Sequence, residues 1–94
     1  MDEAREVELF ALLGSKGTKK ILQYLCEHGK AQYKDLGLDI SLPTLNLRLP
    51  LLLKFNLIEH HMARETKRKE WYEITEKGKK ILQHLQEMIE LIEE

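Results

Sequence analysis

Residues 41–75 read SLPTLNLRLPLLLKFNLIEHHMARETKRKEWYEIT, and this stretch decides the fold. It opens with a helix signal, because the Ser41 hydroxyl can accept a hydrogen bond from the free amide of Thr44, and Pro43 is tolerated in a first turn. Three leucines then recur at helical spacing, so one side of this helix is expected to face a core. They are Leu45, Leu49 and Leu52.

The second half of the stretch predicts a β-hairpin. Residues 58–64 and 69–74 are strand-like and bracket the polar turn 65–68, and Asn56 is suited to end the preceding helix. Side chains alternate along the second strand, so one of its faces is expected to be buried and the other wetter. The buried set is Tyr72 and Ile74, and the wetter set is Trp71 and Glu73.

Two helices are predicted upstream of this stretch. The first spans residues 2–13. The second begins at a cap formed by either Ser15 or Thr18, runs to about His28, and ends at Gly29 in a left-handed conformation. One face of the second helix is apolar and carries Ile21, Leu22, Leu25 and Cys26.

The remaining segments complete an α+β domain. Residues 31–33 form at most a minimal strand, residues 34–38 form at most a short helix, and Thr75 caps a last helix. Helices that cover one side of a hairpin make two packed layers, which is an α+β arrangement. The 94 residues suffice for one domain. Its parts are an N-terminal helix (1–14), a central unit (15–75) and a C-terminal helix (76–94).

The net charge of −1 conceals an uneven distribution of charge. Residues 16–80 carry 14 basic and 8 acidic side chains, whereas residues 1–15 have a net charge of −3 and residues 81–94 a net charge of −4. A basic middle between acidic ends can bind a polyanion locally, although the average charge is close to neutral. The most basic run is 64–69, which contains Arg64, Lys67, Arg68 and Lys69.

Four short motifs, taken in order, are typical of one class of protein. They are Gly17-Thr18-Lys19-Lys20-Ile21-Leu22, Ser41-Leu42-Pro43-Thr44-Leu45, Leu57-Ile58-Glu59 and Tyr72-Glu73-Ile74-Thr75-Glu76-Lys77-Gly78. With the predicted element order, residues 15–80 resemble the winged helix-turn-helix domains of small prokaryotic transcriptional regulators, of the ArsR-like and PadR-like kind. The resemblance implies a three-helix core with a β-hairpin wing, in a homodimer that binds double-stranded DNA.

The resemblance also implies how DNA would be bound. Helix 41–54 would enter the major groove, and the basic wing 64–69 would contact phosphates or a minor groove. Taken by itself, the run 64–69 is equally consistent with a solvated β-turn. The residues predicted to contact DNA are Lys34, Ser41, Thr44, Asn46, Leu47, Arg48, Arg64, Lys67, Arg68 and Lys69.

The outward face of helix 41–54 is unusual for a helix that recognises DNA bases, because Lys54 is its only charged residue. Asn46 can hydrogen-bond an adenine edge and a leucine can touch a thymine methyl, so we expect mostly electrostatic binding with modest sequence preference. An apolar face also suits a protein partner, so the alternative function is a winged-helix protein-interaction module with a solvated wing. The outward residues are Pro43, Leu47, Pro50, Leu51 and Lys54.

Pro50 lies inside this predicted helix. A proline there removes a backbone donor and costs about 3 kcal/mol in a regular helix. We therefore expect either a kink at Pro50 or an end to the regular part of the helix near Leu49.

Apolar residues of the terminal helices predict a dimer interface. In the last helix they recur with a heptad-like spacing and exceed what one short flank needs, and the first helix has an apolar side of its own. A helix that packs only within its own chain is the alternative. The predicted interface residues are Val7, Phe10, Leu13, Leu82, Leu85, Met88, Ile89 and Ile92.

No metal, cofactor or catalytic site is expected. Cys26 and His28 point in different directions on a helix, and His60 and His61 fall on opposite faces of a strand, so neither pair converges on a metal. Cys26 is instead expected to be a small core side chain. Motifs for phosphate binding or nucleophilic catalysis are missing, so we expect no enzyme activity. The single cysteine, with no signal peptide or bilayer-length apolar run, predicts a cytoplasmic location.

Overall fold

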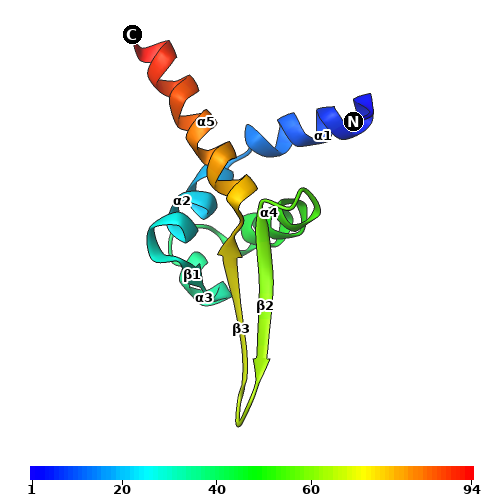
Figure 1. Cartoon of the computed structure of the whole chain (residues 1–94), viewed down its shortest axis with the longest axis vertical. Helices are drawn as coiled ribbons and strands as arrows, with labels where there is room; N and C mark the ends of the chain where they lie inside the picture. Colours follow the sequence, from blue (N-terminus) through cyan, green and yellow to red (C-terminus); the bar gives the residue numbers. More distant parts are fainter.

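The computed structural model describes all residues 1–94 and contains five helices and a three-stranded sheet (Figure 1). The helices are α1 (Glu3–Leu13), α2 (Thr18–His28), α3 (Tyr33–Leu36), α4 (Leu42–Lys54) and α5 (Glu76–Glu93). The strands are β1 (Lys30–Ala31), β2 (Ile58–Arg64) and β3 (Arg68–Ile74), and they pair antiparallel in the order β1-β3-β2. This is the predicted α+β winged-helix architecture. None of its helices combines the length and apolar character needed to cross a bilayer.

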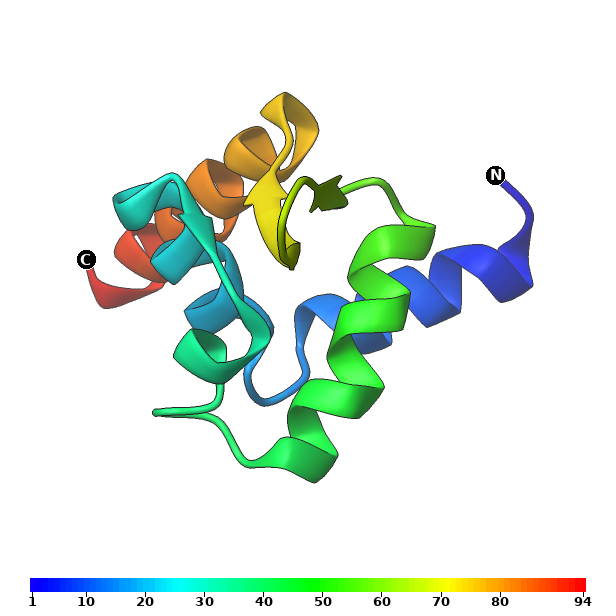
Figure 2. The same cartoon turned by 90° about the horizontal axis from the view of Figure 1, so that it is seen from below.

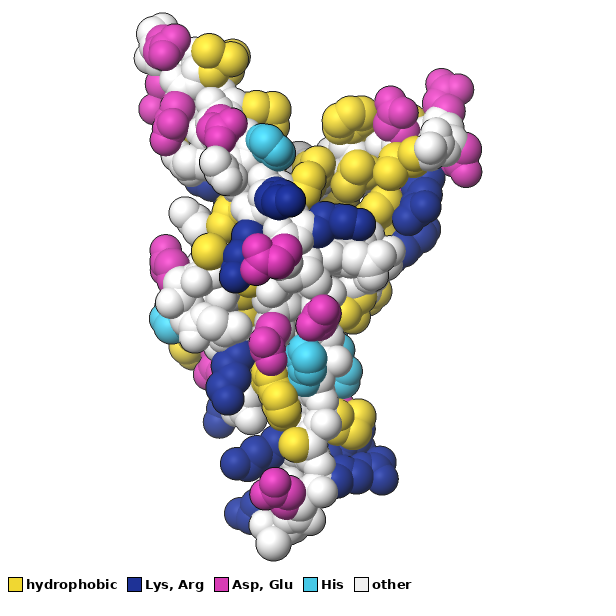
Figure 3. Space-filling model, in the orientation of Figure 1, with side chains coloured by type: hydrophobic (Ala, Val, Ile, Leu, Met, Phe, Trp, Pro, Cys, Tyr) yellow, Lys and Arg dark blue, Asp and Glu magenta, His cyan; other side chains and the backbone are white.

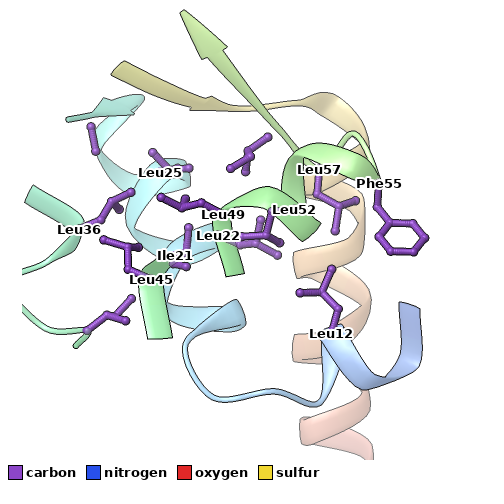
Figure 4. Close-up of a cluster of buried hydrophobic side chains, with 13 residues drawn as sticks. Leu12, Ile21, Leu22, Leu25, Leu36, Leu45, Leu49, Leu52, Phe55 and Leu57 are labelled. Carbon is purple, nitrogen blue, oxygen red and sulfur yellow. The ribbon is translucent and has the colours of Figure 1, made fainter. Parts of the chain in front are cut away.

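One hydrophobic core joins α1, α2, α4 and the first residues of β2 (Figure 4). The three leucines predicted to face it, Leu45, Leu49 and Leu52, are all buried. Burial of a leucine side chain stabilises a fold by about 1.5–3 kcal/mol. The core is therefore made mainly by the two longer helices of the central unit, and it fixes the orientation of α4. Its buried members are Leu12, Ile21, Leu22, Leu25, Ala31, Leu36, Ile40, Leu45, Leu49, Leu52, Phe55, Leu57 and Ile58.

The hairpin of β2 and β3 projects from this core (Figure 1). Its register runs from Ile58 opposite Ile74, at the core, to Arg64 opposite Arg68 at the tip. Strand β1 covers only the base of the hairpin, because it pairs with β3 at residues 72–73 alone. The tip therefore has no third strand beside it, and the molecule is elongated, with extents of 51 × 31 × 26 Å.

Gly78 allows α5 to start directly against the entry to the hairpin. A Cβ atom at this position would lie 2.0 Å from the carbonyl oxygen of Leu57 and 3.0 Å from its carbonyl carbon. Neighbouring hydrogen bonds hold this approach in place, because the Thr75 amide donates to the same Leu57 oxygen at 3.1 Å. The Thr75 hydroxyl also accepts from the Gly78 amide at 2.9 Å, which confirms the predicted cap.

We expect Gly78→Ala to lower the free energy of unfolding by about 3 kcal/mol, since the clash is with backbone that has no free space to move into. Urea denaturation followed by circular dichroism measures this change. Gly14→Ala is the matched control, because its Cβ would meet only the Phe10 carbonyl oxygen at 3.5 Å and its φ of −88° suits any residue. Equal midpoints for the two variants would contradict the close-approach account.

The start of α2 differs from the prediction, because neither Ser15 nor Thr18 caps it. The N-cap residue is Gly17, whose φ of +93° is left-handed and which has no side chain to offer a cap. The Thr18 hydroxyl is fully buried and donates to the Leu12 carbonyl oxygen at 2.6 Å, while the Ser15 hydroxyl donates to the Ala11 carbonyl. Both hydroxyls therefore bind the last turn of α1 and anchor it to the core.

Two further details of the short elements and the sheet were predicted wrongly. Strand β1 ends at Ala31 and does not continue through residue 33, because Gln32 already forms a capping box with Asp35 at the start of α3. The two faces of β3 were predicted to differ in burial, but both are half-buried. Neighbouring side chains cover Trp71 on one face, and the core covers Tyr72 on the other.

The prediction for Cys26 was also wrong, and of the two outcomes expected at Pro50 the structure excludes an end of the helix near Leu49. Cys26 is exposed, because it lies at the margin of the apolar stripe in the last turn of α2, where no element covers it. Helix α4 continues through Pro50 to Lys54. Burial of Leu49 before the proline and Leu52 after it outweighs the cost of the missing hydrogen bond.

Candidate nucleic-acid interface

The tip of the hairpin carries the densest positive charge of the molecule. Arg64, Lys67, Arg68 and Lys69 are all exposed there, and only Arg68 forms an ion pair, with its Nη2 3.1 Å from Oε1 of Glu70. Lys and Arg side chains gather at this end, whereas acidic side chains gather on the ends of α1 and α5 (Figure 3). The uneven charge of the sequence is thus separated in space.

These cations stand on both faces of a narrow ribbon. The register places Arg64 and Arg68 together on one face and Lys69, opposite Ala63, on the other. Neighbouring strands of a hairpin are only about 5 Å apart, so side chains from both faces can reach the two phosphate strands that border a minor groove about 6 Å wide. The tip can thus engage a polyanion from either side.

An open groove of about 680 Å³ lies between the wing and the start of α3. Lys67 and Lys69 line it from the wing, and Lys30 lines it from β1. Sequence reasoning missed Lys30, because its position beside the wing depends on the pairing of Lys30 with Glu73 across two distant segments. Lys30 therefore adds a third cation to a groove that begins at the wing tip.

Aromatic contacts stiffen the base of the wing on both faces. On one face the Trp71 ring stacks with His61 at 5.6 Å between centroids, and its Nε1 donates to Glu73 at 2.7 Å. On the other face His60 packs against Tyr72 at 5.1 Å, so the two histidines lie on opposite faces as predicted. Burial raises the pKa of Tyr72, with smaller contributions in the same direction from Glu70 and Tyr33, so this phenol stays neutral at physiological pH.

Helix α4 begins with two hydroxyl groups at its exposed end. The Ser41 side chain accepts from the Thr44 amide at 3.4 Å and donates to the Thr44 hydroxyl at 2.9 Å. Ser41 therefore acts as the predicted cap, and the first turn still presents free backbone amides, which favour an anion. Viewed from the hairpin end, α3 and α4 lie beside the hairpin on the same side of the molecule (Figure 2).

The two cationic side chains of α4 each contact the N-terminal part of the chain. Arg48 is half-buried, and its Nε donates to the backbone oxygen of Lys16 at 2.9 Å. Lys54 pairs with Glu8 of α1, with 2.6 Å between Nζ and Oε1. Both side chains hold α4 to the N-terminal part of the chain. Leu51 is half-buried against the core as well, so the outward face is narrower than predicted.

The remaining residues predicted to contact DNA lie on α3 and α4. Lys34 is exposed on α3, and Asn46 and Leu47 are exposed on α4. The Tyr33 hydroxyl of α3 donates to Oδ1 of Asn46, a contact that sequence reasoning missed because it links two helices. Of the ten predicted residues, the structure thus gathers all but Arg48 on the α3–α4 side or at the wing tip, and their contact with DNA stays a prediction.

The terminal helices form a second surface, remote from the wing tip. Helices α1 and α5 diverge from the body as two arms (Figure 1), and apolar side chains remain exposed on both. The exposed fractions are 65% for Phe10 and 84% for Ile92. A mainly apolar groove of about 460 Å³ runs between the end of α1 and α5, lined by Leu13, Lys19, Leu85, Met88, Ile89, Ile92 and Glu93.

Comparison with known proteins identifies similar sequences and folds. A model of the HxlR-like helix-turn-helix family matches residues 12–94. No curated protein matches the chain. Among solved structures, the reduced form of the transcriptional regulator YodB from B. subtilis is 31% identical, with 94% of this chain and 87% of that chain covered and a TM-score of 0.75.

Two more distant structures share the fold. A protein assigned to the MarR family of transcriptional regulators, from Enterococcus faecalis V583, is 21% identical over 99% of this chain and 87% of that chain, with a TM-score of 0.78. A transcriptional regulator homologue from Pyrococcus horikoshii OT3 is 22% identical over 98% of each chain, with a TM-score of 0.70. At these identities the similarity shows the architecture alone.

Proposed function

The chain belongs to the HxlR-like helix-turn-helix family, and on that premise we propose that it is a transcriptional regulator that binds double-stranded DNA as a homodimer. The α4 helix enters the major groove, and the wing tip contacts phosphates or the adjacent minor groove. The family differs from the ArsR-like and PadR-like families that the sequence motifs resembled. Those motifs mark the winged-helix fold, which several families of regulators share.

The single observation that carries the proposal is the free positive charge of the wing tip. Arg64, Lys67 and Lys69 have no ion-pair partner in the protein, and they extend beyond the core on a ribbon without other packing. Phosphate contacts by such side chains provide affinity that does not depend on sequence. The 31% identical relative from B. subtilis is itself described as a transcriptional regulator, which supports this function.

A second copy of the chain is the proposed partner for the terminal helices. The exposed apolar side chains lie on two arms of one chain, and an apolar patch of this kind usually marks an interface. An interface around a two-fold axis uses the same patch from each copy, and it would present two wings to one DNA duplex.

A mobility-shift assay with duplex DNA at several salt concentrations tests the function. We expect a retarded complex whose affinity falls steeply with salt, with a slope of about −0.9 in log K against log salt for each phosphate contacted. If no retarded complex forms even at low salt, the proposal is wrong. If the protein retards a single-stranded oligonucleotide but not the duplex, the assignment to double-stranded DNA is wrong.

A further inference from the structure

The exposed face of α4 has no charge of its own. Arg48 is held by the Lys16 carbonyl oxygen and Lys54 by Glu8, so each cation of this helix already has a partner within the chain. Leu47 is 63% exposed at the centre of the face, and Leu42 is 53% exposed near its start. Two polar side chains lie between them, namely exposed Asn46 and half-buried Thr44, whose hydroxyl accepts from Ser41. Beyond the hydroxyl groups of its first turn, this face can therefore contact a base only with leucine methyl groups and one amide.

The amide of Asn46 is oriented by the protein. The Tyr33 hydroxyl donates to Oδ1 of Asn46, so Oδ1 is the end of the amide that faces α3. Nδ2, which has two hydrogens, is then the end left to face a ligand. This orientation presents a donor to acceptors on a base edge, and it leaves only one Oδ1 lone pair for the two-bond pairing with adenine.

Only one natural base presents both a hydrogen-bond acceptor and a methyl group in the major groove. Thymine has the O4 acceptor and, beside it, the C5 methyl group, whereas cytosine presents a donor and no methyl. On the basis of the function proposed above, we propose that α4 recognises thymine, with Leu47 against the C5 methyl and Nδ2 of Asn46 donating to O4 of the same or a neighbouring thymine. Tyr33 is the positioning residue for this contact.

The surroundings of this face favour a nucleic acid as its occupant. Exposed Lys34 stands on α3, which lies with α4 beside the hairpin that carries the cations of the wing tip (Figure 2). An apolar strip flanked by cations matches the major groove, where thymine methyls lie between two phosphate strands. A protein partner for the strip is the competing outcome that the following experiment separates.

Deoxyuridine provides the direct test, because it lacks only the C5 methyl group of thymidine. We would measure, by fluorescence anisotropy, the affinity for an alternating A·T duplex and for the same duplex with deoxyuridine in place of every thymidine. We expect about fourfold weaker binding for each methyl contacted, which corresponds to about 0.8 kcal/mol. Leu47→Ala should bind both duplexes equally. Leu91→Ala is the control, since Leu91 is 66% exposed on α5, and any effect of this substitution on the dimer should weaken binding of both duplexes equally and leave their ratio unchanged.

A double-mutant cycle tests the role of Tyr33. Tyr33→Phe and Asn46→Ala should each weaken binding of the A·T duplex, and Tyr33→Phe should have no further effect in the Asn46→Ala background. Additive effects of the two substitutions would overturn the positioning role, because a merely structural effect of Tyr33 would persist without Asn46.

The outcomes distinguish this inference from the function on which it rests. Equal binding of the thymidine and deoxyuridine duplexes by the unmodified protein would overturn thymine recognition while DNA binding stands. Binding of neither duplex at low salt would overturn DNA binding itself. Loss of discrimination in Leu47→Ala with retained salt-dependent binding would support both.

Discussion

Glutamate at both Phe10 and Ile92 is expected to convert the dimer to monomers. Both side chains are largely exposed in the single chain, so the substitutions should leave its fold intact. In the proposed interface each glutamate would be buried without a partner, which costs several kcal/mol for each charge. We expect the dissociation constant of the dimer to rise by at least about 10³-fold. DNA affinity should fall by about 10²-fold or more, since the two wings would no longer bind together.

Sedimentation velocity measures the oligomeric state, and anisotropy with duplex DNA measures the accompanying loss of affinity. Gln83→Glu is the control for a charge on this helix, because it places one glutamate on the side of α5 opposite to Ile92. A double variant that remains a dimer would show that the second copy binds elsewhere. If the unmodified protein is itself monomeric at micromolar concentration, the proposed interface is wrong.

Alanine at Lys67, Arg68 and Lys69 is expected to remove most of the salt-dependent affinity for DNA. The three side chains are exposed and do not pack against the core, so the thermal stability should be unchanged. Removal of each side chain that binds a phosphate should reduce the slope of log K against log salt by about 0.9. At about 0.1 M salt we expect affinity to fall by roughly 10²-fold or more.

Anisotropy measurements over a series of salt concentrations give both quantities. The matched control replaces three lysines, which are likewise exposed but stand at the start of α5, by alanine: Lys77, Lys79 and Lys80. The account fails if the control variant weakens binding as much as the wing variant, because the effect would then reflect net charge and not the position of the wing.

Much of the fold followed from local rules in the sequence. The Ser41 cap, the three leucines of α4, the hairpin and the Thr75 cap depend on residues a few positions apart, and the structure has all of them. The errors occurred where a distant segment decides the outcome. The sequence did not reveal that Thr18 binds the Leu12 carbonyl and does not cap its own helix. It also left open whether helix 41–54 continues past Pro50, which it does because Leu49 and Leu52 are buried on either side.

The candidate site was less predictable for the same reason. The basic run of the wing is contiguous in sequence, so its charge was evident at once. The partners of Arg48 and Lys54 lie in α1 and the loop after it, so the absence of charge on α4 emerges only from the packing. The hydrogen bond from Tyr33 to Asn46 likewise depends on how α3 meets α4, which no periodicity encodes.

The central claim is that DNA docks on one side of the molecule, across the wing tip and the α3–α4 side. Backbone amide chemical shifts, measured by NMR during titration with duplex DNA, test this most directly. We predict that the largest shifts fall in residues 64–69 and around the start of α4, while the arms of α1 and α5 remain unchanged. Shifts confined to the two arms, with an unaffected wing, would contradict the account.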